Sequence, residues 1–204
     1  KLYSMVGAGP LASYIGFTEE EVKRLCEQYH RDFEEVKRWY DGYQLGNYHV
    51  YNPNAVVSLM ADGEFQSYWS GTASYDGIVP LINMDFDGLK SALLTMLSGD
   101  GIPVKTKSYQ NDMVSFKNKD DVMTALIHLG YLAYNQKERT AFIPNEEVRS
   151  AFVLAIRNRG WDEVYKAIEN SEKLLKATLA MNETAVAKML QDVHMQNSSS
   201  LVYN

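Results

Sequence analysis

Apolar residues recur at helical spacing along much of the chain. The first such face consists of Val22, Leu25, Cys26 and Tyr29. These residues lie three or four positions apart, which predicts a helix with one buried side. Thr18 and Glu21 stand in the order of a capping box just before this face, so the helix is expected to begin there. The same spacing predicts further helices after Asp32 and from Pro53 to Gly63.

The pattern changes in the middle of the chain. Residues 102–106 alternate in polarity and predict a strand, and residues 113–116 are a possible second one. From about residue 119 to 158 the pattern predicts a helix, a strand, a polar turn, a strand and another helix. That order is typical of a winged-helix-like unit. A helical domain with an incidental hairpin is the alternative.

After Gly160 the pattern is helical to near the end of the chain. It predicts three segments, one over 161–168, one capped by Ser171 and one capped by Asn182. The sequence therefore predicts a mainly α fold with a small β component. We expect a helical domain that includes the winged-helix-like unit in residues 1–160, and further helices in residues 161–204.

Composition narrows the possible classes of protein. The chain has 204 residues, of which 46% are hydrophobic, so it can form a core. A net charge of -6 argues against nucleic-acid binding over the whole surface, although it leaves room for a local basic patch. Cys26 is the single cysteine, which excludes an intrachain disulfide and favours the cytoplasm. No apolar run is long enough to cross a membrane. A start without Met and an apolar end, Leu201–Val202–Tyr203, favour a piece of a longer protein.

The motifs of common catalytic sites are absent from the sequence. There is no Gly-x-x-x-x-Gly-Lys-Ser/Thr loop to hold a phosphate. One cysteine and four scattered histidines give no metal-site spacing. The two Glu-x-Lys tripeptides of the chain lie in predicted helices, whereas two-metal nucleases place theirs on strands. We therefore predict no catalytic, cofactor-binding or metal-binding residue in this chain.

Basic residues in and beside the predicted hairpin are the candidates for an interaction. Lys137 and Arg139 fall in its polar turn, and Arg149 follows on the next helix. Such side chains could contact phosphate or an acidic partner. An ordinary solvated turn explains them equally simply and is the interpretation favoured by the sequence.

Six segments of the chain, in order, carry a resemblance to a known family. They are Gly16–Val22, Trp39–Tyr43 (Trp-Tyr-Asp-Gly-Tyr), Tyr51–Val56, Phe65–Trp69, His128–Leu132 and Phe142–Arg149. With them the chain resembles the AAA-ATPase-like proteins of bacteria that are fused to a PD-(D/E)XK nuclease-like domain.

In that family the phosphate-binding loop precedes the Gly16 segment, and the nuclease residues follow the region that this chain covers. The resemblance thus implies that residues 1–160 are the helical and winged-helix-like part after the nucleotide-binding core. Residues 161–204 would be the linker and first helices of the nuclease-like domain. ATP and Mg²⁺ are expected for the parent protein only.

The resemblance implies a role for the chain between two active regions. The leading hypothesis is a lid or signal-transmitting fragment whose main partner is the rest of its own chain, with Asp41 and Tyr43 as candidate interaction residues. The alternative is a winged-helix-like module that binds DNA or a protein, through Lys137, Arg139 and Arg149. An inactive interaction protein is a third hypothesis. The oligomeric state is left open.

Overall fold

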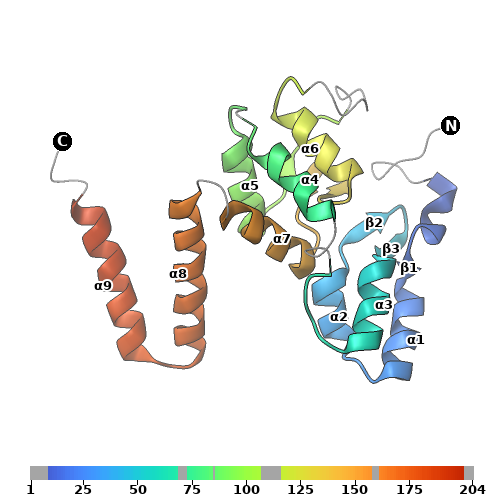
Figure 1. Ribbon diagram of the computed structural model, residues 1–204, viewed down its shortest axis with the longest axis horizontal. Helices are drawn as coiled ribbons and strands as arrows, with labels where there is room; N and C mark the ends of the chain where they lie inside the picture. The colour runs from blue at the N-terminus through green and yellow to red at the C-terminus, as the bar shows by residue number, and fades with distance from the viewer. Residues whose placement is uncertain (1–8, 69–72, 85, 107–115, 158–160, 200–204) are drawn as a thin grey trace. The chain divides into compact units, whose positions relative to one another are not determined.

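The computed structural model describes residues 9–68, 73–84, 86–106, 116–157 and 161–199. Over these residues the chain is mainly α-helical with two small antiparallel sheets, as predicted (Figure 1). It divides into two compact units, Lys1–Ala155 and Ile156–Asn204. The possible strand at residues 113–116 lies mostly outside the described residues.

The helices and strands follow one another with short connections. The helices are a 3₁₀ helix at Gly9–Tyr14, α1 (Glu19–Tyr29), α2 (Phe33–Tyr40), α3 (Pro53–Asp62), α4 (Ala73–Ile82), α5 (Leu89–Leu97), α6 (Lys119–His128), α7 (Glu146–Arg157), α8 (Asp162–Leu179) and α9 (Glu183–Ser199). The strands are β1 (Phe17–Thr18), β2 (Tyr43–Leu45), β3 (Tyr48–Tyr51), β4 (Ile102–Pro103), β5 (Ala133–Asn135) and β6 (Thr140–Phe142).

Helices α1 to α3 and the sheet β1-β3-β2 form the first part of unit 1. The capping box predicted for α1 is present, since Thr18 and Glu21 each bond to the other's backbone N–H. Asp32 caps α2, and Asn52 caps α3. The predicted starts of these three helices are thus confirmed, because each depends on a side chain within three residues of the helix.

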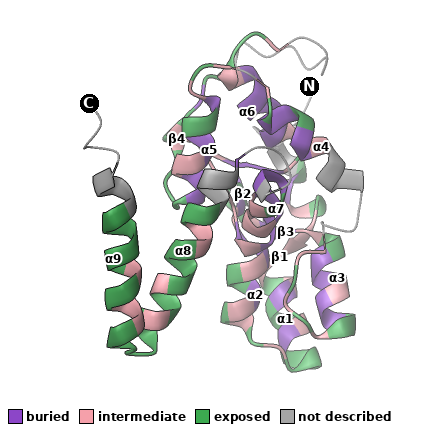
Figure 2. Ribbon diagram, turned by 60° about the vertical axis from the view of Figure 1, so that its left-hand side comes forward, coloured by how far each residue is buried: buried purple, intermediate pink, exposed green. Residues whose placement is uncertain are grey.

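A core of buried residues lies between these three helices and strand β3, whose buried positions are coloured purple in Figure 2. It consists of Val22, Cys26, Val36, Tyr40, Tyr51, Ala55, Val56, Leu59 and Met60. Tyr40 has the rings of Phe65 and Tyr68 beside it, with centroids 6.4 and 6.3 Å away. These aromatic residues therefore close one side of a core rather than line an open surface.

The predicted order of helix, strand, turn, strand and helix is confirmed as α6, β5, β6 and α7. Strand β6 lies in the centre of a second sheet, between β5 and β4. Asn118 caps α6 and Asn145 accepts a hydrogen bond from Val148 in the first turn of α7. Ala133 of β5 packs against Tyr43 and Leu45 of β2, so the two sheets share a small apolar core.

The second unit contains α8 and α9, which pack against each other as a helical hairpin. The predicted break at Ser171 is wrong, because α8 runs without interruption from Asp162 to Leu179. The Ser171 hydroxyl donates to the carbonyl of Ala167, 2.9 Å away, so it stays within the helix instead of capping a new one. Asn182 does cap α9, since it accepts from the N–H of Ala185.

Exposed residues dominate the described part of the helical hairpin (Figure 2). No side chain that the structure describes between residues 166 and 195 is buried. Among the described helices, none combines the length and the apolar character that a membrane span requires.

Candidate functional site

Asp41 is the centre of the candidate site. It ends α2 as the C-cap residue, and its N–H donates to the carbonyl of Lys37. Its side chain is 8% exposed. A buried carboxylate needs partners, because an unpaired charge is costly away from water. The partner that the structure provides is His49, which comes from strand β3 after a hairpin turn at Gly46.

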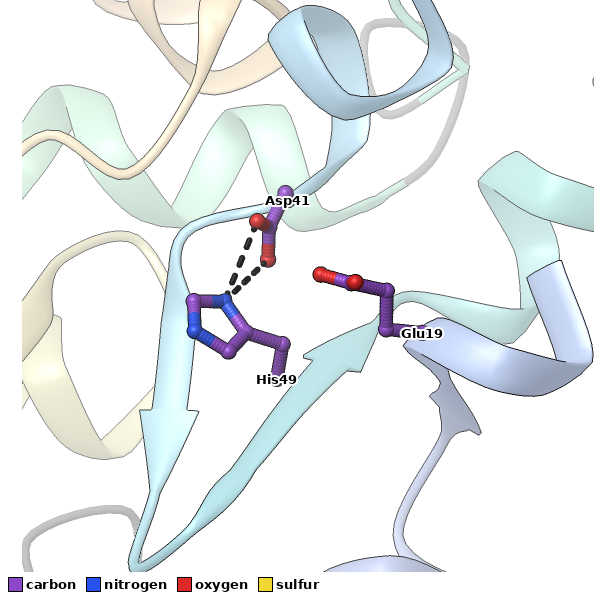
Figure 3. Close-up of side chains that lie close together, drawn as sticks. All are labelled: Glu19, Asp41 and His49. Atoms are coloured by element: carbon purple, nitrogen blue, oxygen red, sulfur yellow. Dashed lines mark hydrogen bonds and ion pairs between the residues drawn. The ribbon is translucent and has the colours of Figure 1, made fainter. Parts of the chain in front are cut away.

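The Asp41 carboxylate and the His49 ring face each other directly (Figure 3). The Nδ1 atom of His49 lies 3.2 and 3.1 Å from the two Asp41 oxygens. Because an ionised carboxylate only accepts hydrogen bonds, Nδ1 carries the proton and donates to both oxygens. The His49 side chain is 43% exposed, so Asp41 forms the inner end of the pair and His49 the outer end.

Glu19 brings a second carboxylate to this pair from the first turn of α1 (Figure 3). One ligand atom each of Glu19, Asp41 and His49 lies within 4.8 Å of the others. Two lysines hold Glu19, Lys23 at 2.6 Å and Lys37 at 3.8 Å. The hydrogen bond from Lys23 is the main cause that lowers the pKa of Glu19. We refer to these three ligand residues as the Glu19–Asp41–His49 cluster.

The backbone beside Asp41 is connected to a distant part of the chain. The Asn145 Nδ2 atom donates to the Asp41 carbonyl across 2.7 Å, although the two residues are 104 positions apart. Gly42 follows at φ +114°, and a Cβ atom there would lie 2.1 Å from the carbonyl oxygen of Pro144. Only glycine fits such a position, because the φ value and the close approach both exclude a side chain.

Tyr43 makes a second connection between distant parts of the chain. Its hydroxyl donates to the carbonyl of Gly130 across 2.6 Å, just beyond the end of α6. The Tyr43 side chain is buried, and this burial raises the pKa of its hydroxyl well above the ordinary value. Tyr43 is therefore neutral at pH 7, and it acts as a hydrogen-bond donor.

A third connection joins the segment after α3 to α7. The Tyr68 N–H donates to the carboxylate of Glu147 across 2.9 Å, and Glu147 is 1% exposed. Four of the six segments quoted for the family resemblance thus meet through their own residues. We call the connected residues the motif junction: Asp41, Gly42, Tyr43, Tyr68, Gly130, Pro144, Asn145 and Glu147.

The basic residues predicted from the sequence lie elsewhere. Lys137 and Arg139 are exposed in the turn between β5 and β6, where Arg139 adopts a positive φ of 57°. Arg149 lies on α7 and pairs with Glu146 at 3.5 Å. The structure therefore brings Asp41 and Tyr43 into one junction, and it keeps Lys137 and Arg139 together in one turn.

Sequence reasoning missed the two residues that lie beside the Asp41 carboxylate in the cluster, His49 and Glu19. His49 is eight positions away from Asp41, a spacing that belongs to no metal or catalytic motif. The one usable signal was the hairpin around Gly46. It returns the chain toward the end of α2 and so could have suggested that a residue of the second strand meets Asp41.

Comparison with known proteins finds a distant similarity to a protein of unassigned function. No family model matches the chain, and no solved structure matches it. Over 141 residues the chain is 27% identical to the "Uncharacterized protein in vnfD 5′ region" of Azotobacter chroococcum mcd 1. That alignment covers 68% of this chain and 25% of the relative, so the chain corresponds to about a quarter of that protein's length.

Proposed function

We propose that this chain is a non-catalytic lid or signal-transmitting part of a bacterial ATPase that also carries a nuclease-like domain. The proposal rests on the family resemblance together with the motif junction. ATP and Mg²⁺ would bind to the nucleotide-binding core upstream, and the rest of the same chain would be the partner. We also propose a cytoplasmic location, in keeping with the single, reduced Cys26.

The observation that carries the proposal is the hydrogen bond from Asn145 to the Asp41 carbonyl. It connects the end of α2 to the first turn of α7, because the Asn145 Oδ1 atom also accepts from the Val148 N–H at 3.0 Å. One side chain thus fixes both the loop that begins at Asp41 and the helix whose last residues enter unit 2. A displacement of α2 would change the start of α7 through this bond.

Signal transmission needs an element with two arrangements that a ligand can bias. The motif junction suits that role because it consists of a few buried or half-buried hydrogen bonds between segments far apart in the chain. Loss of one such bond leaves a buried polar group without a partner, which costs about 1–3 kcal/mol. An energy of this size is also typical of the coupling between two binding sites.

The test is a substitution that removes this bond and keeps the helix cap. In the intact parent protein, Asn145→Asp retains an oxygen for the Val148 N–H and loses the NH₂ group that donates to Asp41. We expect the effect of ATP on nuclease activity, or the rate of ATP hydrolysis, to change by about fivefold or more.

Asn118→Asp is the matched control, because Asn118 caps α6 through the Asp121 N–H and lies outside the motif junction. It should leave both activities near the wild-type values. Unchanged ATP hydrolysis and unchanged nuclease activity in a folded Asn145→Asp protein would contradict the proposal.

A second candidate function is nucleic-acid binding by the hairpin turn. It is favoured by the exposure of Lys137 and Arg139, for which the described part of the chain provides no ion-pair partner. In the double variant Lys137→Glu and Arg139→Glu, binding to duplex DNA at low salt should fall and its salt dependence should become weaker. Equal binding by the wild-type chain and this variant would dismiss the idea.

A further inference from the structure

The Glu19–Asp41–His49 cluster offers two kinds of metal ligand at one place. Its members come from the first turn of α1, the C-terminal end of α2 and strand β3, so only the fold brings them together (Figure 3). Their ligand atoms lie within 4.8 Å of one another. Two carboxylates at this separation repel each other, and a cation between them would remove that repulsion.

The inner carboxylate is incompletely satisfied. The two oxygens of Asp41 share one N–H group, that of His49, and within the described residues no group outside the cluster donates to them. The side chain is more than nine-tenths buried. Buried carboxylates are normally paired, hydrogen-bonded several times or coordinated to a metal, so one shared donor is an unusual environment.

A residue close by in the sequence also has a buried polar group that lacks a hydrogen-bond partner. Tyr51 is fully buried, and its hydroxyl has no hydrogen-bond partner among the described residues. Tyr51, two residues after His49 on β3, thus adds a second buried polar group without a full set of partners.

The distances fit a small ion. Two ligands bonded at 2.0–2.2 Å to a tetrahedral Zn²⁺ ion lie about 3.4 Å apart. The Nδ1 atom of His49 and the Asp41 oxygens are 3.1–3.2 Å apart, and the half-exposed His49 ring must move back for an ion to replace the Nδ1 proton with bonds of about 2.0–2.2 Å. The Glu19 side chain is 29% exposed on the first turn of its helix, so it can move inward to complete the site. Remaining positions would be open to water.

The chemistry of the ligands selects the class of ion. An imidazole nitrogen suits transition metals, whereas Mg²⁺ and Ca²⁺ prefer oxygen alone. We propose that Glu19, Asp41 and His49 bind one divalent transition-metal ion, such as Zn²⁺ or Mn²⁺. The proposal is independent of the coupling to ATP, since it concerns an equilibrium that this chain can show by itself.

Two lysines compete for the outer ligand. Lys23 bonds to one oxygen of Glu19 at 2.6 Å, and Lys37 lies 3.8 Å from the other. The Lys23 pair is exposed, and such pairs contribute little stability, so a metal can displace it. Removal of Lys23 should therefore strengthen metal binding, which an incidental surface site elsewhere would not show.

The test is isothermal titration calorimetry, in which the metal-free chain is titrated separately with ZnCl₂, MnCl₂ and MgCl₂. We expect one Zn²⁺ or Mn²⁺ per chain and weaker binding of Mg²⁺. His49→Gln and Glu19→Gln should each weaken Zn²⁺ binding by about 100-fold or more, as should Asp41→Asn. Lys23→Gln should tighten it by about two- to fivefold.

Controls of the same residue types lie nearby. Glu20→Gln changes the exposed carboxylate next to Glu19. His30→Asn changes an exposed histidine with a left-handed backbone, a conformation that asparagine also adopts. Both should bind Zn²⁺ like the wild type. If Asp41→Asn does not fold, the two outer variants decide the question. Absence of saturable binding, or binding that survives both His49→Gln and Glu19→Gln, would overturn the proposal, as would an equal loss in the controls.

Discussion

At the scale of the residue, Gly42 determines how closely α2 and α7 approach. Its φ is +114°, and a Cβ atom would lie 2.1, 2.7 and 2.8 Å from three backbone atoms of Pro144. Backbone atoms cannot turn aside as a flexible side chain can. A substitution at this position must therefore separate the two segments or break the bond between Asn145 and Asp41.

Gly42→Ala is expected to lower the free energy of unfolding by about 3 kcal/mol or more, from backbone strain and the clash together. Gly46→Ala is the matched control. Gly46 also has a positive φ, 66°, but nothing lies within 4 Å of its Cβ position. The control should lose only about 1–2 kcal/mol, the usual cost of a left-handed conformation. Urea unfolding followed by tryptophan fluorescence measures both values, and equal losses would contradict the role of Pro144.

At the scale of the element, the start of α1 depends on the charge of Glu21. Hydrogen bonds from Thr18, first from its N–H and then from its hydroxyl, lower the pKa of Glu21. The pKa is thus lower in the folded chain than its unfolded value of 4.5. The stability that the ionised group contributes is present above that pH and is lost as the pH falls through the folded value.

Glu21→Gln should therefore lower the free energy of unfolding at pH 7 by about 0.5–1 kcal/mol. The difference from the wild type should shrink as the pH falls below 4.5. Glu20→Gln removes one charge from the same turn without affecting the capping box, and it should change the stability less. A difference for Glu21→Gln that does not vary with pH would count against this account.

At the scale of the whole molecule, the two units differ in how they are stabilised. Unit 1 contains clusters of buried apolar side chains, whereas the described side chains of α8 and α9 between residues 166 and 195 include none that is buried. Because helices derive most of their stability from packing, we expect α8 and α9 to open more readily than α1, α3 and α6.

Amide hydrogen exchange of the 204-residue chain measures this difference. Amides in the middle of α8 and α9 should exchange at least about tenfold faster than those in α1, α3 and α6, which corresponds to about 1.4 kcal/mol or more in opening free energy. Equal protection in both units would show that α8 and α9 are stabilised by more than their mutual contact.

The sequence by itself determined most of the elements. Helix starts at Thr18, Asp32, Asn52 and Asn118 were predictable, because a cap and the first turn lie within a few residues. The order of elements from α6 to α7 followed from polarity and turn residues for the same reason. The break at Ser171 was the exception. A serine can cap a helix or bond within one, and the local sequence does not distinguish the two.

Only the tertiary structure decided what the quoted motifs contact. Tyr43 meets Gly130 and Asp41 meets Asn145 across 87 and 104 positions of sequence, and no periodicity reports such a pairing. The Glu19–Asp41–His49 cluster arose in the same way, from a helix start, a helix end and a strand that packing brings side by side. Caps and periodicity act over a few residues, whereas the site depends on how the finished elements pack.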